Sequence, residues 1–569
     1  MALEHDVIVI GGGAGGMTAA AVAASEGLDV LLVEKSAQLG GTTAISGGMV
    51  WVPGNSLSRE VGQPDTIEAA RTYLAHTVSG AHNAAVREAF LTQADAAITY
   101  LDQHTSVHLR PVHTYPDYYP DLPGAAMGGR VLEPVPFDAR VLGRSFALVR
   151  PPLPEFTLFG GMMVSRAELP HFRDVGRSLS STARVARLVA AHLWQRLSYP
   201  RGTSLALGNA LVARLLDTLL RQKVGLRLSA SVSGLTQEDG AVRGAIINGQ
   251  TVRARRAVVL ATGGFAHSPQ LRSMLLPKEA GALSAVSADN TGDGIRLGLQ
   301  CDARLETAGD GAAFWVPVSR FTRPDGTQAL FPHTVTDRGK PGVIAVNRAA
   351  RRFVNEARSY HEFVRAMLRA DNAGSADGSG TGVHLICDRD FLWRYGIGAV
   401  HPMCLSLGQW CRSGYLTKAR SIGDLAGKIG LDPAALEQTV ADYNVAARRG
   451  EDPLFGRGSD AYQRHMGDAA RTPNPCVAPI ERAPFYAVAL YPGDLGTSTG
   501  LATDAEARAL GPDGQPISGL YVVGNDMNSV MNGAYPGPGI TLGPALTFGY
   551  LAARSIAAGA GKGDWHART

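Results

Sequence analysis

The sequence is poor in the residues that build disulfide frameworks and metal centres. Its 569 residues include five cysteines, and no two of them form a CxxC pair. We therefore predict neither a disulfide framework nor a zinc site, and the missing pair also argues against a pyridine-nucleotide-disulfide reductase. Buried or inert thiols are the better interpretation of these cysteines.

Long apolar runs and blocks of like charge are also missing. No uninterrupted apolar segment reaches the ~18 residues that span a bilayer, and residues 1–6 lack the features of a secretory signal. The formal net charge is only +4 and the arginines are spread along the chain, which argues against a nucleic-acid-binding surface. We expect a cytoplasmic, soluble protein without a nucleic-acid partner.

Glycine, in contrast, is abundant, and the first glycines form a pattern. Residues 7–10 are a β-branched run that suits a buried strand, and Gly11, Gly13 and Gly16 follow at GxGxxG spacing. Gly11 permits a tight turn, Gly13 lets a pyrophosphate approach the backbone, and Gly16 lets a helix over residues 17–25 pack on the sheet. The pattern predicts the start of a dinucleotide-binding unit.

A second strand and a second glycine-rich loop continue this unit. Residues 30–33 are predicted to form a strand that leads to Glu34, whose carboxylate is placed to accept hydrogen bonds from a ribose diol. The residues of the loop at 40–48, GGTTAISGG, are small enough for backbone amides to run along a flat cofactor and its phosphates. A flexible glycine loop is the alternative.

Two later segments repeat the pattern of a strand that runs into glycine. They are RAVVLATGG at residues 256–264 and GLYVVGN at residues 519–525. Ligands of doubly wound sheets bind where such strands end, so we expect all three glycine turns to meet at one site. The fold class is therefore α/β.

The length of the chain predicts two domains, because 569 residues exceed one compact core. We expect a Rossmann-like dinucleotide-binding domain made of residues 1–285 and 482–569. An α+β domain at residues 286–481 interrupts it.

Tyrosines gather in the loop at residues 113–123, HTYPDYYPDLP, whose prolines exclude a regular helix. The phenols of Tyr115, Tyr118 and Tyr119 either pack in the core or line a pocket.

Residues 181–200 are predicted to form a cationic amphipathic helix. Val185, Leu188, Leu193 and other apolar residues follow one side, and arginines lie away from them. Peripheral contact with the inner face of a membrane and a core-facing helix both fit this period.

The loop at residues 535–539, YPGPG, presents few N–H groups. Its two prolines have no amide hydrogen, so the amides left free after Tyr535 are those of Gly537 and Gly539. Beside the Tyr535 phenol, such an amide would hold a ketone oxygen and stabilise negative charge that develops on it. A purely structural turn is the alternative.

The helix predicted over residues 545–557 follows this loop. Thr541 is placed to cap it. The positive end of the helix would then face the N1/C2 edge of a flavin and favour the anionic reduced form.

Together these motifs resemble the flavoprotein 3-ketosteroid Δ1-dehydrogenases, within the fumarate reductase/succinate dehydrogenase flavoprotein superfamily. The matching motifs occur in the order GxGxxG with Glu34, GGTTAISGG, PDYY, ATGG, RRFVNEARSY, PGDLGTSTG and AYPGPG. The resemblance implies that the interrupted domain binds FAD and that residues 286–481 form a catalytic lid. An insert near residues 166–201 is not part of the compact form of this family, and we expect it to serve bulkier or membrane-dissolved sterols.

The resemblance also implies catalytic roles. Tyr535 and the amide of Gly539 would bind the C3 carbonyl of a 3-ketosteroid or a similar hydrophobic ketone. Tyr360, assisted by Tyr118, would take a proton from C2, and the C1 hydride would pass to flavin N5. An external electron acceptor, a quinone or a dye, would reoxidise the flavin, because no second nucleotide fingerprint is present.

We expect FAD to be bound non-covalently, since residues 42–55 contain no histidine for a histidyl flavin. The residues assigned to FAD binding are Gly11, Gly13, Gly15, Gly16, Glu34, Lys35, Gly41, Thr42, Thr43, Ser46, Gly47, Gly48, Ala261, Thr262, Gly263, Asp293, Gly524, Asn525, Gly539, Thr541 and Leu542.

Three alternatives use the same scaffold: a Δ4-directed steroid dehydrogenase, a fumarate reductase-like dicarboxylate reductase, and a flavin redox sensor without turnover. A dicarboxylate reductase would need Arg and His groups to clamp its substrate, and the YPGPG loop has neither.

Overall fold

A computed structural model describes residues 3–80, 83–176, 178–307, 311–369 and 382–559. Among these residues the larger sheet has eight strands, in the order β20-β21-β11-β1-β2-β8, with β10 beside β11 and β9 beside β10. Its strands are β1 (Glu4–Ile10), β2 (Val30–Val33), β8 (Gly225–Arg227), β9 (Val232–Glu238), β10 (Ala241–Ile247), β11 (Gln250–Leu260), β20 (Arg508–Leu510) and β21 (Pro516–Val522).

The centre of this sheet is parallel, as its buried β-branched strands predict. β1 lies between β2 and β11, and β21 adds to the far side of β11. Ile10 is in register with Val33 and Leu260, and Leu260 with Val522, so the strands end at one edge. The three expected strands and their shared edge are confirmed.

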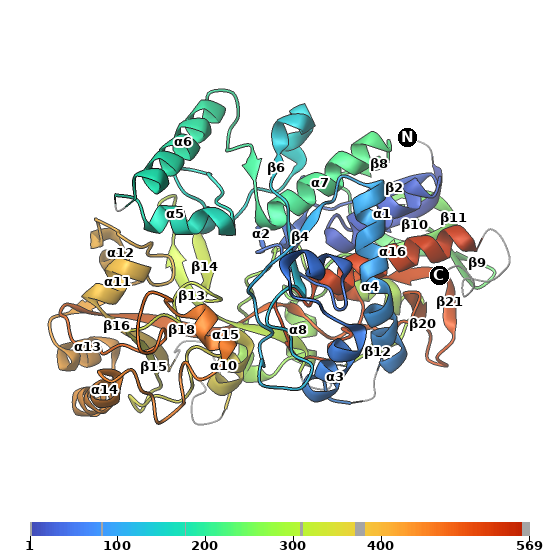
Figure 1. Ribbon diagram of the computed structural model, residues 1–569. Helices are drawn as coiled ribbons and strands as arrows, with labels where there is room; N and C mark the ends of the chain where they lie inside the picture. Colours follow the sequence, from blue (N-terminus) through green and yellow to red (C-terminus); the bar gives the residue numbers. More distant parts are fainter. Residues whose placement is uncertain (1–2, 81–82, 177, 308–310, 370–381, 560–569) are drawn as a thin grey trace.

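Helices cover this sheet (Figure 1), and those predicted at residues 17–25 and 545–557 are both present. The first and last of them pack on each other. Those on or beside the sheet are α1 (Ala14–Ser25), α2 (Gly41–Ile45), α4 (Ala84–His104), α7 (Leu207–Arg221), α9 (Asp293–Leu299) and α16 (Leu542–Ala558). α1 and α16 each begin three residues earlier than expected.

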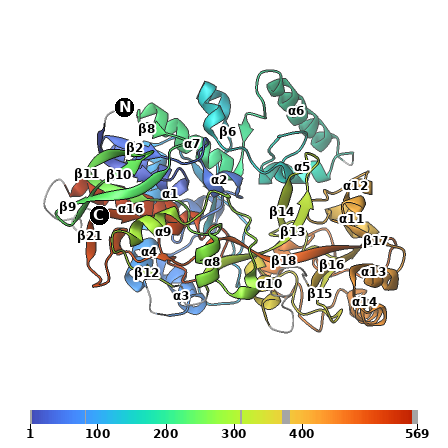
Figure 2. The same cartoon turned by 180° about the vertical axis from the view of Figure 1, so that it is seen from behind.

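A second, largely antiparallel sheet lies beside the first (Figures 1 and 2). Its strands are β13 (Ala313–Thr322), β14 (Gln328–Pro332), β15 (Val343–Val346), β16 (Val383–Asp388), β17 (Thr417–Ala419) and β18 (Phe485–Thr497). The long strand β18 pairs with β13, β16 and β17, so this sheet extends past residue 482, where we expected the chain to return to the first domain. The helices around it are α10 (Tyr360–Met367), α11 (Arg389–Tyr395), α12 (Gly408–Arg412), α13 (Ile422–Ile429), α14 (Pro433–Ala447) and α15 (Ala461–Met466).

The remaining elements belong to neither of the two large sheets. The other helices are α3 (Ile67–Thr77), α5 (Leu169–Arg173), α6 (Leu179–Arg196) and α8 (Pro269–Leu275). The small sheets are β3 (Val50–Trp51) with β5 (Val131–Pro134) and β4 (Leu109–Pro111), β6 (Phe137–Asp138) with β7 (Ser204–Leu205), and β12 (Leu305–Glu306) with β19 (Gly500–Leu501). Residues 113–123 form the expected non-helical loop.

The helix predicted at residues 181–200 is present as α6, which projects at the outer edge of the molecule next to α5 (Figures 1 and 2). Val185, Leu188 and Val189 are half-buried, whereas Leu193 and Leu197 are 58% and 77% exposed. The alternative of a core-facing helix in which all five of these residues are buried is therefore wrong. Within the described residues, no helix combines the length and the apolar character needed to cross a bilayer.

Candidate active site

Three tyrosines predicted to act together do meet in the structure. Tyr118 comes from the 113–123 loop, Tyr360 is the first residue of α10, and Tyr535 opens the YPGPG loop. The Tyr118 hydroxyl donates a hydrogen bond of 3.0 Å to the Tyr360 hydroxyl. The ring of Tyr535 lies 5.1 Å from that of Tyr360 and 5.6 Å from that of Tyr118.

Burial dominates the electrostatics of these phenols. It raises the pKa of Tyr118 and of Tyr360 well above 10, and that of Tyr535 to about 12. The hydrogen bond from Tyr118 acts in the opposite direction and lowers the pKa of Tyr360. Tyr360 in turn lowers the pKa of Tyr535, so each phenol stabilises charge on the next one in the order Tyr118, Tyr360, Tyr535.

Hydrogen bonds hold the two tyrosine loops together. The Tyr118 amide donates to the Pro536 carbonyl at 2.9 Å, and the Tyr73 hydroxyl on α3 donates to the same carbonyl at 2.6 Å. The positions of Tyr118 and Tyr535 are thus set relative to each other by backbone contacts.

A buried polar network lies directly behind these loops. Asp117 accepts hydrogen bonds from Trp51 Nε1 at 2.8 Å and from Arg130 at 2.6 Å, and Arg130 also pairs with Asp65. A Cβ on Gly537 would lie 2.7 Å from Trp51 Nε1, so the YPGPG loop packs against this hydrogen bond. Sequence reasoning missed Trp51, Asp117 and Arg130, because a buried ion pair between distant segments leaves no local pattern.

The Gly539 amide has the properties expected of a carbonyl-binding donor. Gly539 is half-buried, and its N–H donates to no acceptor in the part of the chain that the structure describes. Its φ of +91° and the Met49 carbonyl, 2.5 Å from the position of a Cβ, require glycine here.

The predicted dinucleotide turn has the geometry that its spacing implies. Gly11 has a φ of +114°, and a Cβ there would lie 2.2 Å from the Ala261 carbonyl. A Cβ on Gly16 would lie 2.0 Å from the Gly11 carbonyl, which confirms the close packing of α1 on the turn. Gly13 precedes α1 and has no atom within 4 Å of its Cβ position, so a diphosphate has room at the helix N-terminus.

Glu34 lies at the end of β2 and is mostly buried. Its carboxylate accepts hydrogen bonds from the Gly12 amide at 2.7 Å and the Ser36 amide at 2.8 Å. Burial raises its pKa. These bonds orient the carboxylate beside the dinucleotide turn, and its contact with a ribose stays a prediction.

The segment at residues 40–48 is not a loop throughout, because residues 41–45 form the short helix α2, and it contains both structural and open glycines. Gly48 abuts the backbone of Leu207 and Gly208, whereas Gly41 and Gly47 have open space at their Cβ positions. Three hydroxyls of this loop bond within the protein. They are Thr42, which accepts from the Ser287 amide at 3.1 Å, Thr43, which accepts from the Ala14 amide at 3.2 Å, and Ser46, which donates to the Thr43 carbonyl at 2.8 Å.

Two other predicted residues pair with each other. Lys35 Nζ lies 2.7 Å from Asp293 Oδ2 at the start of α9, 258 residues away in the chain. Thr262 is also bonded internally, because its amide and hydroxyl both donate to the buried Asp526. Asp526 was missed, although an acid directly after a strand and its glycine turn is a usable signal.

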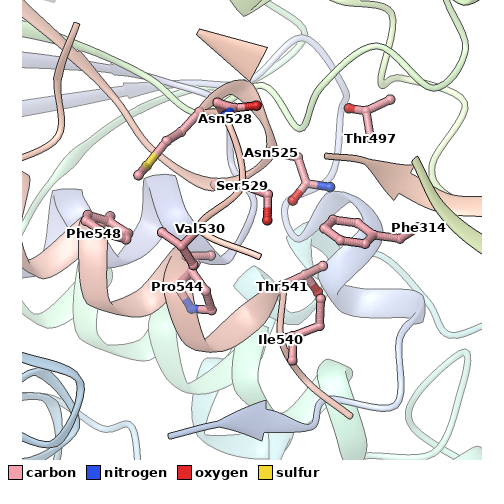
Figure 3. A pocket seen from close by; sticks show the side chains of 13 residues that line it. Phe314, Thr497, Asn525, Asn528, Ser529, Val530, Ile540, Thr541, Pro544 and Phe548 are labelled. Atoms are coloured by element: carbon pink, nitrogen blue, oxygen red, sulfur yellow. The ribbon is translucent and has the colours of Figure 1, made fainter. Parts of the chain in front are cut away.

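A cavity opens at the N-terminal end of α16 (Figure 3). Figure 3 shows the side chains of Asn525, Ser529, Phe314 and Thr541 around it. Gly524 lines it too, and its Cβ position is open. The predicted cap is wrong, because Thr541 precedes α16 but its side chain accepts no capping hydrogen bond, and its backbone is already helical.

His361 is a further residue that sequence reasoning missed. Its ring lies 5.7 Å from that of Tyr535, and its Nδ1 accepts the Trp315 amide at 3.2 Å. Burial lowers the pKa of His361 to about 3. The ring is therefore neutral, with its proton on Nε2, which has no partner among the described residues.

Comparison with known proteins adds to this geometry. Residues 6–542 match the model of the FAD binding domain family. The crystal structure of 3-ketosteroid delta1-dehydrogenase from Sterolibacterium denitrificans, in complex with 1,4-androstadiene-3,17-dione, superposes with a TM-score of 0.87 at 38% identity and covers 98% of this chain and 100% of that one.

Curated relatives cover nearly the same length. A 3-oxosteroid 1-dehydrogenase of Mycobacterium tuberculosis is 37% identical over 98% of this chain and 99% of its own. A 4-oxocyclohex-2-ene-1-carboxylate 5-dehydrogenase of Sinomonas cyclohexanicum is 39% identical over 97% of this chain and 93% of its own.

The chain belongs to the 3-ketosteroid Δ1-dehydrogenase family of FAD-binding flavoproteins. The predicted resemblance, the α/β fold and FAD as cofactor are thereby confirmed. As in other members of this family, the chain is an FAD-dependent oxidoreductase. The open positions at Gly13, Gly41, Gly47 and Gly524 fit an extended dinucleotide, and the assignment of each contact stays a prediction.

Proposed function

We propose that the chain catalyses the 1,2-dehydrogenation of a 3-ketosteroid to the 1-ene-3-one. The observation that carries the proposal is the meeting of Tyr118, Tyr360 and Tyr535 beside the free amide of Gly539. The names of the steroid dehydrogenase relatives support the choice of substrate.

The carbonyl is held by the C-terminal loop. The Tyr535 hydroxyl and the Gly539 amide donate to the C3 oxygen and stabilise the negative charge that develops there. Burial keeps the Tyr535 phenol protonated, because its pKa is raised to about 12. The carbonyl thus acidifies the neighbouring C2–H bond.

The C2 proton passes to the Tyr360 oxygen. A free phenol is a weak base, but the hydrogen bond from Tyr118 stabilises the oxygen of Tyr360 as charge moves through it. The buried guanidinium of Arg338 interacts electrostatically with both phenols and supports the same charge. FAD bound at the glycine turns supplies the acceptor for the hydride that leaves C1.

We also propose the division of the chain into a FAD-binding part, residues 1–285 and 482–569, and a catalytic part, residues 286–481. An external quinone-type acceptor would take up the electrons. The ranges are supported by the two sheets, although β18 continues the second sheet to Thr497.

The test is incubation of the holoenzyme with androst-4-ene-3,17-dione and an artificial electron acceptor, followed by product identification. We expect androsta-1,4-diene-3,17-dione. No turnover of this substrate, together with conversion of 5α-androstane-3,17-dione to the 4-ene-3-one, supports the Δ4-directed alternative, and no turnover with any cyclic ketone supports a redox sensor.

A peripheral membrane contact through α6 is the second part of the proposal. α6 exposes Leu179 at 92%, Trp194 at 76% and Leu197 at 77%, and Arg187 and Arg196 are exposed on the same helix. Apolar side chains with arginines suit the surface of an anionic bilayer, in which sterol substrates dissolve.

Sedimentation with vesicles of phosphatidylglycerol and phosphatidylcholine tests this contact. We expect the double variant Trp194→Ser/Leu197→Ser to lose most vesicle binding and to keep its activity on dissolved substrate. Leu454→Ser is the matched control, since Leu454 is 68% exposed elsewhere on the molecule. Equal binding by all three proteins contradicts the membrane contact.

A further inference from the structure

An arginine that the proposed mechanism does not use lies next to the candidate active site. Arg166 begins the short 3₁₀ helix Arg166–Glu168, at the start of the predicted insert. Its guanidinium carbon lies 4.8 Å from the centre of the Tyr115 ring, and its positive charge acts to lower the pKa of that phenol against the effect of burial. Its Nη2 lies 3.9 Å from the sulfur of Met49.

Tyr115, the first neighbour of Arg166, packs next to the proposed catalytic phenols. The Tyr115 ring packs on His465 at 4.7 Å, and the Tyr118 ring packs on Tyr462 at 4.7 Å. His465 and Tyr462 both lie on α15, three residues apart, which is about one helical turn or ~5 Å. Tyr115 and Tyr118 therefore form successive layers, and Arg166 lies on the first.

Met49, the second neighbour of Arg166, also lies beside the candidate active site. The backbone carbonyl of Met49 lies 2.5 Å from the Cβ position of Gly539, the proposed donor to the ketone oxygen. Arg166 thus touches one residue beside each half of the site.

The positive charge of Arg166 is incompletely neutralised. Glu133 lies 3.6 Å from Arg166 Nε, but its other oxygen already accepts two hydrogen bonds from Arg110, at 2.9 and 2.7 Å. Two guanidinium groups therefore share one carboxylate. Its other interactions within the described residues are with a phenol, a thioether and His465, whose pKa burial lowers to about 4, and the Arg166 side chain is 34% exposed.

We propose that the same site also oxidises a second substrate class, cyclic ketones with a carboxylate across the ring from the carbonyl, and that Arg166 binds this carboxylate. The inference rests on the proposed dehydrogenase function. A guanidinium with a planar fork of donors and no full counter-ion is suited to pair with a carboxylate, whereas a steroid places only hydrocarbon there.

The reaction is unchanged for this class. One proton passes from the α-carbon to Tyr360, one hydride leaves the β-carbon for FAD, and the two carbons form a double bond. The 4-oxocyclohex-2-ene-1-carboxylate 5-dehydrogenase of Sinomonas cyclohexanicum is named for a substrate of the same chemical class.

The test compares three substrates with the holoenzyme and a dye acceptor: 4-oxocyclohexanecarboxylate, its methyl ester, and androst-4-ene-3,17-dione. We expect wild type to prefer the acid to the ester by at least ~10-fold in kcat/KM. Arg166→Gln is expected to lower kcat/KM for the acid about 100-fold, mainly through KM, and to leave the ester and the steroid within about threefold. Arg166→Lys is expected to be intermediate.

Arg110→Gln is the matched control, because it removes the other guanidinium from Glu133 without touching Tyr115 or Met49. It is expected to keep the acid-to-ester ratio. Flavin absorbance and the thermal midpoint check that each variant is folded. The acid-to-ester ratio of kcat/KM in the wild type tests the carboxylate site without any variant.

Three results overturn the inference. Wild type that turns over the ester as well as the acid has no carboxylate site. An equal loss on all three substrates in Arg166→Gln indicates a structural arginine. If none of the three substrates is turned over, the dehydrogenase function itself is contradicted. This outcome differs from a failure of the carboxylate site alone, in which the steroid is still oxidised.

Discussion

At the scale of single residues, the chemistry depends on phenols that come from three distant segments. Tyr118, Tyr360 and Tyr535 each lie at most 5% exposed, and each is placed by its own loop or helix start. The sequence predicts these three through their motifs. It does not predict Asp117, Arg130 or His361, because their roles depend on contacts across the fold and their own surroundings in the chain carry no pattern.

Removal of the hydroxyl groups tests the roles of the phenols. We expect Tyr360→Phe and Tyr535→Phe to lower kcat at least ~100-fold, because one loses the proton acceptor and the other a carbonyl donor. Both variants should keep bound, yellow FAD. Tyr443→Phe is the control, since this buried phenol donates to the Ala478 carbonyl in a separate core. Near-wild-type turnover in both site variants would contradict the assignment.

His361 predicts a dependence of stability on pH. Its pKa is lowered from 6.5 to about 3 in the folded protein, so below pH 6.5 the unfolded chain binds a proton that the folded one does not. The stabilisation is complete above pH 6.5 and is lost as pH falls toward 3, at about 1.4 kcal/mol per pH unit.

Urea unfolding at pH 7 and pH 5 measures this effect. Wild type should lose about 2 kcal/mol more than His361→Gln between these values. His76→Gln replaces an exposed histidine and should behave like wild type. Equal losses in wild type and His361→Gln would show that His361 is not buried in its neutral form.

At the scale of elements, the buried strands and the glycine turns were the most predictable parts. β1, β2, β11 and β21 end at the expected edge because a β-branched run followed by glycine has few other structures to form. The direction in which α6 faces was less predictable, since an amphipathic period is the same toward a core or toward solvent. The partners of β18 were not predictable from the local sequence either, because its pairing with β13 and β16 is decided by distant strands.

The contact between the YPGPG loop and the Trp51–Asp117 hydrogen bond is an element-scale prediction. Gly537→Ala places a methyl group 2.7 Å from Trp51 Nε1 and 3.0 Å from Asp117 Oδ1, so the loop must shift. We expect kcat to fall about 10-fold with little change in FAD content, because ångström-scale misplacement of reacting groups is costly.

Gly427→Ala is the control for Gly537→Ala. Gly427 lies inside α13 with open space at its Cβ position, and alanine should be neutral or stabilise the helix by up to ~1 kcal/mol. Unchanged turnover in Gly537→Ala would mean that the loop tolerates displacement and that its alignment is set elsewhere.

At the scale of the whole molecule, the predicted FAD site draws on segments from both ends of the chain. Gly11 and Gly13, the 41–48 loop, Ala261 and Asn525 lie far apart in sequence and surround one edge of the sheet. Cofactor binding should therefore stabilise the entire fold.

Titration of the apoprotein with FAD measures this coupling. At free FAD 100 times its Kd, the folded state should gain about 2.7 kcal/mol, seen as a rise in the thermal midpoint. Glu34→Gln should need more FAD for the same rise. An unchanged midpoint in wild type would mean that FAD does not bind across these segments.

The packing of α1 against α16 has a consequence for how the protein is made. A Cβ on Gly549 would lie 2.7 Å from the Gly15 carbonyl, so the first helix of the nucleotide turn is covered by residues synthesised more than five hundred positions later. While a ribosome is still translating the middle of the chain, the sheet lacks β21 and α1 lacks its covering helix α16. We therefore expect FAD to bind late in biogenesis. A nascent chain halted before residue 520 should lack the yellow colour of bound flavin.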